Sequence, residues 1–156
     1  MSKNKQQPSE LYIVWQDEWS VGHHELDEQH KTIISLINLY FNPDYSNTQK
    51  NITFSKVIEV MKNHLDYEEN LLVENAYPDI EEHKRMHQMF CNKINQFSKN
   101  PFHDKHPNSD DIINLFKTWW LEHIINEDSK YVSFLPGSPP YFTNLNVRKM
   151  AVPSIH

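Results

Sequence analysis

The stretch that decides the fold is VIEVMKNHLDYEENLLVENAYPDIEEHKRMHQMFCNKI, residues 57–94. Pro78 divides it, because proline lacks the backbone N–H that a helix interior requires. On both sides of Pro78, apolar residues recur at the spacing that places them on one face of a helix. These residues are Val57, Met61, Leu65, Leu71 and Leu72 before the proline and Met86, Phe90, Ile94 and Phe97 after it. The stretch predicts two amphipathic helices, one capped by Asn47 and running to about Asn75, the other from about Asp79 to Lys99.

Two further amphipathic segments flank this pair. The first runs from about Asp27 to Phe41 and stops before Pro43, and the last runs from a cap at Ser109 to about Phe134. Their apolar positions are Leu26, Ile33, Ile34, Ile37, Tyr40 and Phe41 in the first, and Ile112, Ile113, Phe116, Trp119 and Trp120 in the last. Four such helices with short connections predict an all-α, antiparallel up-down-up-down four-helix bundle, with extended arms before Asp27 and after Pro136.

Composition limits the function classes. A chain of 156 residues suits one domain, here 1–135, followed by a proline-containing C-terminal arm, 136–156. The net charge is -6 and the basic residues are scattered, which excludes a nucleic-acid footprint. No stretch approaches the roughly 20 apolar residues of a membrane helix. We therefore expect no membrane partner. The single cysteine, Cys91, cannot form an intramolecular disulfide, so we expect a cytoplasmic protein.

The ten histidines divide into two sets. Five lie on the predicted apolar stripes, namely His30, His64, His83, His87 and His123, whereas His23, His24, His103, His106 and His156 are expected in arms or loops. His64 and Glu68 are four residues apart, as are His83 and His87. Residues at this spacing lie one turn apart on one helix face, so their side chains can converge on one ion.

The fourth helix offers His123 and Asp128, and their spacing is the weakest signal. Five residues advance an α-helix by about 140°, so the two side chains share a face only if the last turns are distorted. A lone histidine on an apolar stripe is more often a hydrogen-bonded core residue than a ligand. Five imidazoles and two carboxylates buried together would be costly, however, and a metal removes that cost.

The number of candidate ligands selects the metal. Seven are too many for one tetrahedral zinc, but they fit two six-coordinate irons that share bridging carboxylates. If Glu68, Asp128 and a solvent oxo or hydroxo group bridge the pair, three histidines complete one iron and two leave the other with an open position. Dioxygen could bind there, and neutral imidazoles favour reversible binding over strongly oxidising chemistry.

These residues resemble the hemerythrin family, specifically its bacterial single-domain branch, across roughly Trp15 to Tyr131. The matching motifs are Trp19-Ser20-Val21-Gly22, Leu26-Asp27-Glu28-Gln29-His30-Lys31, His64-Leu65-Asp66-Tyr67-Glu68-Glu69, Tyr77-Pro78, His83-Lys84-Arg85-Met86-His87-Gln88-Met89-Phe90, and Trp120-Leu121-Glu122-His123-Ile124 with Asp128 and Tyr131. The resemblance implies that His83, His87 and His123 bind the saturated iron, that His30 and His64 bind the open one, and that Glu68 and Asp128 bridge. Leu72, where the family often has methionine, and the arm 136–156 depart from the pattern.

Three functions follow in order of preference. The first is reversible dioxygen binding at the di-iron centre for storage, delivery or sensing, without enzymatic catalysis. The second is a di-iron enzyme with peroxidase, nitric-oxide or iron-oxidising activity. The third is a helical interaction protein or zinc-bound scaffold with structural histidines. The sequence identifies no protein partner.

Overall fold

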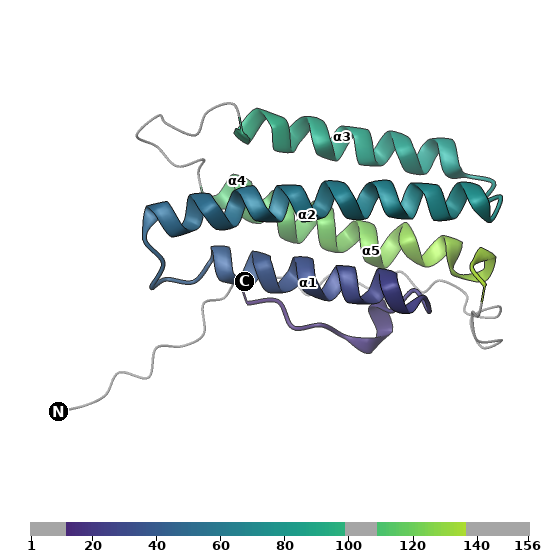
Figure 1. Cartoon of the computed structure of the whole chain (residues 1–156), viewed down its shortest axis with the longest axis horizontal. Helices are drawn as coiled ribbons and strands as arrows, with labels where there is room; N and C mark the ends of the chain where they lie inside the picture. Colours follow the sequence, from purple (N-terminus) through teal and green to yellow (C-terminus); the bar gives the residue numbers. More distant parts are fainter. Residues whose placement is uncertain (1–11, 99–108, 137–156) are drawn as a thin grey trace.

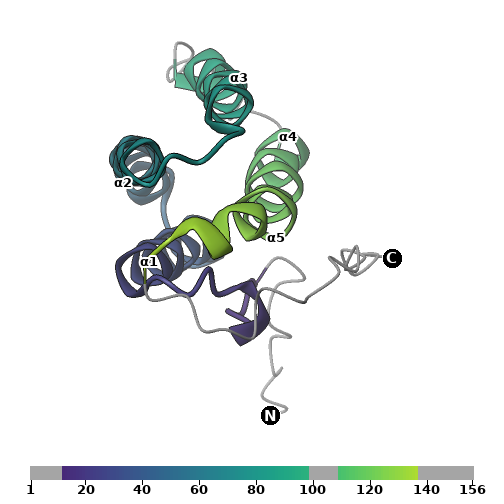
Figure 2. The same ribbon diagram turned by 90° about the vertical axis from the view of Figure 1, so that its right-hand side faces the viewer.

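The computed structural model describes residues 12–98 and 109–136 and forms a four-helix bundle. Its first three helices are α1 (His24–Tyr40), α2 (Asn47–Glu74) and α3 (Ile80–Ser98). The fourth is one continuous run of α4 (Ser109–Ile113), the π-helical segment η2 (Asn114–Leu121) and α5 (Glu122–Asn126). Two 3-10 turns, η1 (Asp17–Trp19) and η3 (Asp128–Phe134), precede α1 and follow α5. Successive helices alternate in direction (Figure 1), and the end-on view shows them surrounding one interior (Figure 2).

The predicted all-α bundle is confirmed, but several details of the helix ends were wrong. Ser109 is the first residue of α4 rather than its cap, and the fourth helix is α-helical only to Asn126 and π-helical at η2. The first helix begins at His24, with His23 as its N-cap, so these two histidines are not in an extended arm. The second helix is capped by Ser46 rather than Asn47. The assignment of 1–135 as one domain stays a prediction, and the predicted arm 136–156 lies outside the described residues except for Pro136.

Ser46 caps α2 because it forms a reciprocal capping box with Gln49. The Ser46 hydroxyl accepts a hydrogen bond from the Gln49 backbone N–H at 3.2 Å, and the Gln49 side-chain oxygen accepts one from the Ser46 backbone N–H at 2.8 Å. Both N–H groups would otherwise lack a partner within the helix. The cap fixes where α2 begins and therefore which of its residues face the interior.

Two apolar clusters fill the bundle. The larger includes Ile33, Ile37, Met61, Phe90, Phe116 and Trp120, and the smaller includes Val21, Leu26, Leu72, Tyr77, Tyr131 and Val132. On every helix, the candidate ligands fall between residues of these two clusters. On α1, for example, His30 lies between Leu26 and Ile33. The polar candidate residues therefore form one layer across the bundle with apolar side chains on both sides.

The segment before α1 is fastened to that helix at two points. The Asn38 side chain accepts a hydrogen bond from the Ile13 N–H at 2.8 Å and donates one to the Ile13 carbonyl at 2.7 Å. Asp27 accepts from the Ser20 hydroxyl at 2.5 Å and from the Val21 N–H at 2.9 Å. These bonds hold the segment along the outside of α1, below it in Figure 1.

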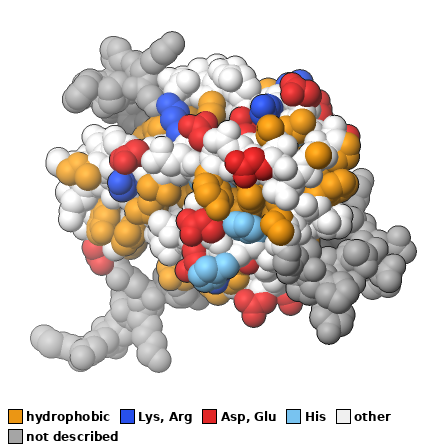
Figure 3. All heavy atoms as spheres, turned by 45° about the vertical axis from the view of Figure 1, so that its right-hand side comes forward, with side chains coloured by type: hydrophobic (Ala, Val, Ile, Leu, Met, Phe, Trp, Pro, Cys, Tyr) orange, Lys and Arg blue, Asp and Glu red, His pale blue; other side chains and the backbone are white. Residues whose placement is uncertain are grey.

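The described helices and the face shown in Figure 3 carry charges of both signs and no apolar membrane-spanning segment. No helix among the described residues combines the length and the apolarity needed to cross a bilayer. On the face shown in Figure 3, the Lys and Arg side chains are interspersed with Asp and Glu. This mixing agrees with the scattered charges of the sequence.

The turn between α2 and α3 contains a left-handed residue that is not glycine. Ala76 has φ 51°. Its N–H donates to the Val73 carbonyl at 3.1 Å, and the Tyr77 N–H donates to the Leu72 carbonyl at 3.0 Å. This is the Schellman pattern that ends helices, and the buried side chains of Leu72 and Tyr77 belong to the same cluster.

We expect Ala76→Gly to raise the free energy of unfolding by about 1 kcal/mol, because glycine has no Cβ to clash in the left-handed region. Chemical denaturation of the metal-free chain measures the change. Ser55→Gly is the matched control, because Ser55 is exposed inside α2. Glycine there should lower the free energy of unfolding by about 0.5 kcal/mol. A loss of stability in Ala76→Gly would contradict the assigned turn.

Candidate metal centre

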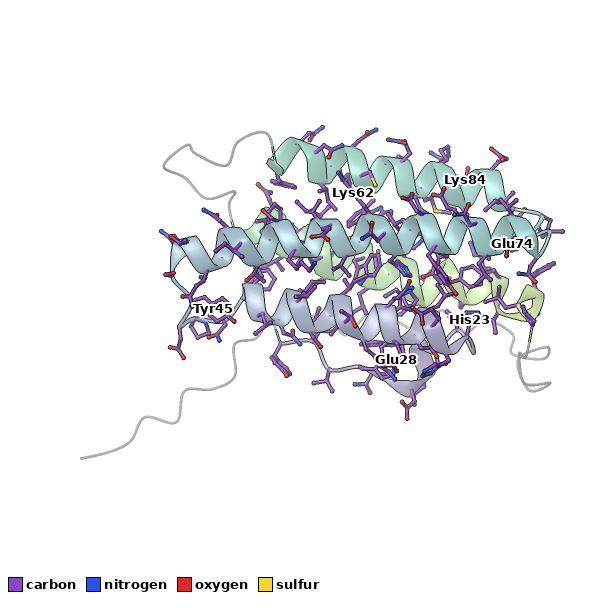
Figure 4. All side chains as sticks on the ribbon, viewed as in Figure 1. His23, Glu28, Tyr45, Lys62, Glu74 and Lys84 are labelled. Atoms are coloured by element: carbon purple, nitrogen blue, oxygen red, sulfur yellow. The ribbon has the colours of Figure 1, made fainter. Side chains whose placement is uncertain are left out.

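The structure brings all seven predicted ligand residues together in the interior of the bundle. His30 comes from α1, His64 and Glu68 from α2, His83 and His87 from α3, His123 from α5 and Asp128 from η3. Each is at most 4% exposed. By contrast, the labelled Lys62 and Glu74 are exposed on α2, while many other side chains fill the space between the helices (Figure 4).

The seven residues form two groups whose nitrogen and oxygen atoms are close enough to hold a metal ion. Glu68, His83, His87, His123 and Asp128 make up one group, and His30, His64 and Glu68 make up the other. Within each group, one ligand atom per residue lies within 4.8 Å of all the others. We call His83, His87 and His123 the three-histidine side and His30 and His64 the two-histidine side. Glu68 belongs to both groups.

Both carboxylates divide their oxygens between the two sides. Glu68 Oε2 lies 3.1 Å from Nε2 of both His83 and His87, whereas Glu68 Oε1 lies 4.0 Å from His64 Nε2. Asp128 Oδ1 lies 3.1 Å from His123 Nε2, and Asp128 Oδ2 lies 3.4 Å from His30 Nε2. Each carboxylate is therefore in position to contact two ions at once.

An irregular helix end brings His123 and Asp128 together despite their unfavourable spacing. The α-helix ends at Asn126, Glu127 has φ -101° and ψ -48°, and a 3-10 segment begins at Asp128. The Glu127 N–H still donates to the His123 carbonyl at 2.8 Å. This change of helix type supplies the distortion that a shared face requires.

Two polar residues fix the orientation of ligand histidines. His64 Nδ1 lies 2.8 Å from Gln29 Oε1, and His87 Nδ1 lies 2.9 Å from Glu69 Oε1. Gln29 donates its amide N–H to Glu25 at 2.9 Å, which leaves its oxygen for His64. An acceptor at Nδ1 keeps the proton there and leaves the Nε2 lone pair for a metal. The roles of Gln29 and Glu69 were not predicted from the sequence, where their only signal is that they are adjacent to His30 and Glu68.

Tyr131, which belongs to the last of the matching motifs, contacts Glu68. Its buried hydroxyl donates a hydrogen bond to Glu68 Oε1. Burial raises the pKa of this phenol well above its usual value, and the negative charges of Asp128 and Glu68 raise it further. Tyr131 therefore remains a hydrogen-bond donor that holds one oxygen of Glu68 in place.

The two carboxylates remain ionised although they are buried. Burial favours the protonated form of Glu68, but hydrogen bonds from His83 and His87 outweigh it and hold the pKa well below its usual value. Burial also opposes the charge on His87, yet its bonds to Glu68 and Glu69 raise its pKa to about 9. At His64, burial dominates and lowers the pKa to about 3, so this imidazole stays neutral.

Buried polar atoms without partners test whether these residues fit a metal. His30 Nε2, His64 Nε2 and both Asp128 oxygens are buried and form no hydrogen bond among the described residues, although the Asp128 oxygens lie 3.1 and 3.4 Å from His123 Nε2 and His30 Nε2. A buried polar atom left without a partner costs about 1–3 kcal/mol. Imidazole nitrogens and carboxylate oxygens are ligands that suit iron and other transition metals. A metal would use these atoms as ligands, so the residues fit one.

A family profile and several known proteins match this chain. A family profile described as "Hemerythrin HHE cation binding domain" matches residues 21–135. The bacteriohemerythrin of Pseudomonas paraeruginosa is 29% identical over 125 residues, which cover 78% of this chain and 80% of that protein. A hemerythrin subunit of Sipunculus nudus is 30% identical and the myohemerythrin of Theromyzon tessulatum is 28% identical. Their matches cover 79% and 75% of this chain and 93% and 88% of those proteins. No solved structure matches significantly.

We expect metal to stabilise the fold. Adding ferrous iron under argon to the metal-free chain should raise the thermal midpoint by about 5 °C or more, because the ion binds the native cluster and neutralises its buried charge. Scanning calorimetry measures the shift. His83→Gln should reduce it, whereas His24→Gln should not, because His24 is exposed. Equal shifts in both variants would rule out the cluster as the binding site.

The hydrogen bond from Gln29 to His64 should matter for metal affinity. We expect Gln29→Leu to weaken metal binding by about 10- to 100-fold, since His64 loses the acceptor that fixes its tautomer. Competition with a chelator of known affinity measures the change. Gln88→Leu is the control, because Gln88 is exposed and donates its hydrogen bond to Asn92, away from the candidate ligands. If both variants bind equally well, Gln29 does not orient the ligand.

Proposed function

The chain belongs to the hemerythrin family, and we propose that it binds dioxygen reversibly at a non-haem di-iron centre, for oxygen storage, delivery or sensing. The observation that carries the proposal is the division of the cluster into three histidines on one side and two on the other. Both carboxylates lie between the two sides. The family profile refers to cation binding, and the relatives include a myohemerythrin and a hemerythrin subunit.

In the proposed centre, His83, His87 and His123 would hold one iron and His30 and His64 would hold the other. Glu68 and Asp128 would bind both irons, together with a solvent oxo or hydroxo group. The split of each carboxylate supports this assignment, because its two oxygens approach histidines of opposite sides. One ligand fewer on the two-histidine side leaves an open position. When bound, the iron pair supplies the electrons and the open position that dioxygen binding needs.

The protein's own residues would keep this site ordered and dry. Gln29 and Glu69 hold the protons on Nδ1 of His64 and His87, so that Nε2 of each ring faces the metal. At His87, the metal would replace the Nε2 proton that the contact with Glu68 favours in the metal-free chain. Tyr131 fixes Glu68 through its hydroxyl proton. Apolar side chains on both sides of the polar layer exclude water, which strengthens every electrostatic contact inside it.

We also propose that the protein is not an enzyme and that it works in the cytoplasm. Five neutral imidazole donors support high-valent iron less well than a carboxylate-rich ligand set would. The compartment is proposed because the chain has a single cysteine and needs no oxidising environment. We propose dioxygen as the ligand of this protein.

The iron-loaded chain should contain two irons per molecule and should develop a ligand-to-iron charge-transfer absorption under oxygen that disappears under argon. Iron analysis and absorption spectra over repeated cycles check this. A His30→Ala, His64→Ala double variant should lose one iron and the reversible absorption, because it lacks the ligands of the two-histidine side. His24→Gln should behave as the unmodified chain.

Three results would reject this function. Oxidation that never reverses would show that the site does not release dioxygen. Sustained turnover of hydrogen peroxide, nitric oxide or ferrous iron by the purified protein would favour the enzyme alternative. One zinc per chain in place of iron would favour a structural site.

A further inference from the structure

One buried donor next to the two-histidine side has no role in the proposed centre. Trp120 is fully buried on η2. Its ring centroid lies 5.4 Å from that of His64 and 5.9 Å from that of His30, at 78° in both cases. The indole therefore packs against both histidines of this side. Its Nε1 has no hydrogen-bond partner among the described residues.

The surroundings of Trp120 explain why no protein group accepts its proton. The indole belongs to the larger apolar cluster, and the ring of Phe90 lies 6.1 Å away. The nearby imidazoles offer no acceptor once they bind metal through one nitrogen, because the other nitrogen then carries a proton. A buried indole N–H usually finds a partner, so its isolation here requires an explanation.

The tryptophan on the three-histidine side has different surroundings. Trp119 lies flat on His123, with ring centroids 4.8 Å apart and planes 8° apart, and it also stacks on Phe90. Trp119 is partly buried, and its nitrogen is not among the buried atoms that lack a partner. Within the described residues, the buried unpaired indole donor is thus found beside the two histidines that leave an open position in the proposed centre.

We propose that the Trp120 indole N–H donates a hydrogen bond to the small ligand that occupies the open position beside His30 and His64. The inference rests on the proposed function and deepens it by naming a residue that sets ligand preference. Trp120 acts here as a ligand-binding residue and transfers neither protons nor electrons. Ligands that carry negative charge or become polarised, such as dioxygen and azide, gain from this bond, whereas carbon monoxide gains less.

The indole also restricts the size of the ligand. It fills space against both histidines, so a larger ligand would have to displace a packed aromatic ring. Size restriction and hydrogen bonding make opposite predictions for a smaller side chain at position 120. Relief of crowding would strengthen ligand binding, whereas loss of the donor would weaken it.

Azide binding to the oxidised, iron-loaded full chain tests the proposal. We expect Trp120→Phe to raise the azide dissociation constant by about 10- to 100-fold, because a hydrogen bond to a charged group is lost. Trp120→Leu, with a different volume, should weaken binding comparably. Trp19→Phe is the matched control, because Trp19 packs at the edge of the same apolar cluster without a ring contact to the candidate ligands.

A second measurement avoids any variant that loads iron poorly. In the unmodified chain with 15N-labelled tryptophan, azide should shift the indole N–H resonance of Trp120 and leave that of Trp19 in place. Trp120→Phe assigns the resonance even in metal-free protein, since the signal disappears. The proton of a newly formed hydrogen bond also exchanges more slowly with solvent.

Unchanged or tighter azide binding in Trp120→Phe, or an indole resonance that azide does not move, would overturn the proposal. A failure of this proposal can be distinguished from a failure of the proposed function. If the unmodified chain oxygenates reversibly and Trp120→Phe binds azide as tightly as it does, the oxygen-binding function stands and the hydrogen bond from Trp120 is rejected. If the iron is oxidised irreversibly but azide shifts the indole N–H resonance of Trp120, the oxygen-binding function is rejected and the hydrogen bond from Trp120 stands.

Discussion

The structure depends on keeping two ionised carboxylates in the middle of an apolar bundle. Glu68 and Asp128 are both fully buried, and an isolated carboxylate in such a position would simply be protonated. Their pKa values stay low because histidines approach their oxygens, His83 and His87 of α3 at Glu68 and His123 of α5 with His30 of α1 at Asp128. Each carboxylate therefore links helices that are distant in sequence. The four helices must meet in one register for this compensation to exist.

Local features at the helix ends set that register. The Ser46 capping box fixes the start of α2, and the Schellman turn at Ala76 fixes its end. Between these points, His64 and Glu68 are held at a constant height in the bundle. The contacts of Asp27 and Asn38 with the preceding segment do the same for α1 and His30. The positions of α1 and α2 along the bundle thus depend on hydrogen bonds far from the site, in addition to the bonds of Gln29, Glu69 and Tyr131 inside it.

The sequence allowed the bundle and the inward-facing candidate residues to be predicted, because both follow from periodicity. His64 with Glu68 and His83 with His87 repeat the spacing of one helical turn along an apolar face. Asp128 could not be placed this way, because an irregular helix end breaks the period. The contacts of Gln29 and Glu69 could not be predicted from periodicity either. They occupy polar positions at the edge of the buried face, and only the three-dimensional packing turns their side chains toward His64 and His87.

These edge residues also make the two sides electronically unequal. His87 shares its Nδ1 proton with the carboxylate of Glu69, whereas His64 shares its proton with the neutral amide of Gln29. A charged acceptor draws the proton more strongly and makes the opposite ring nitrogen a better donor to metal. A metal on the three-histidine side would therefore receive more electron density and a fuller set of ligands. The two-histidine side would hold the more electrophilic ion, and that is where Trp120 supplies a free N–H.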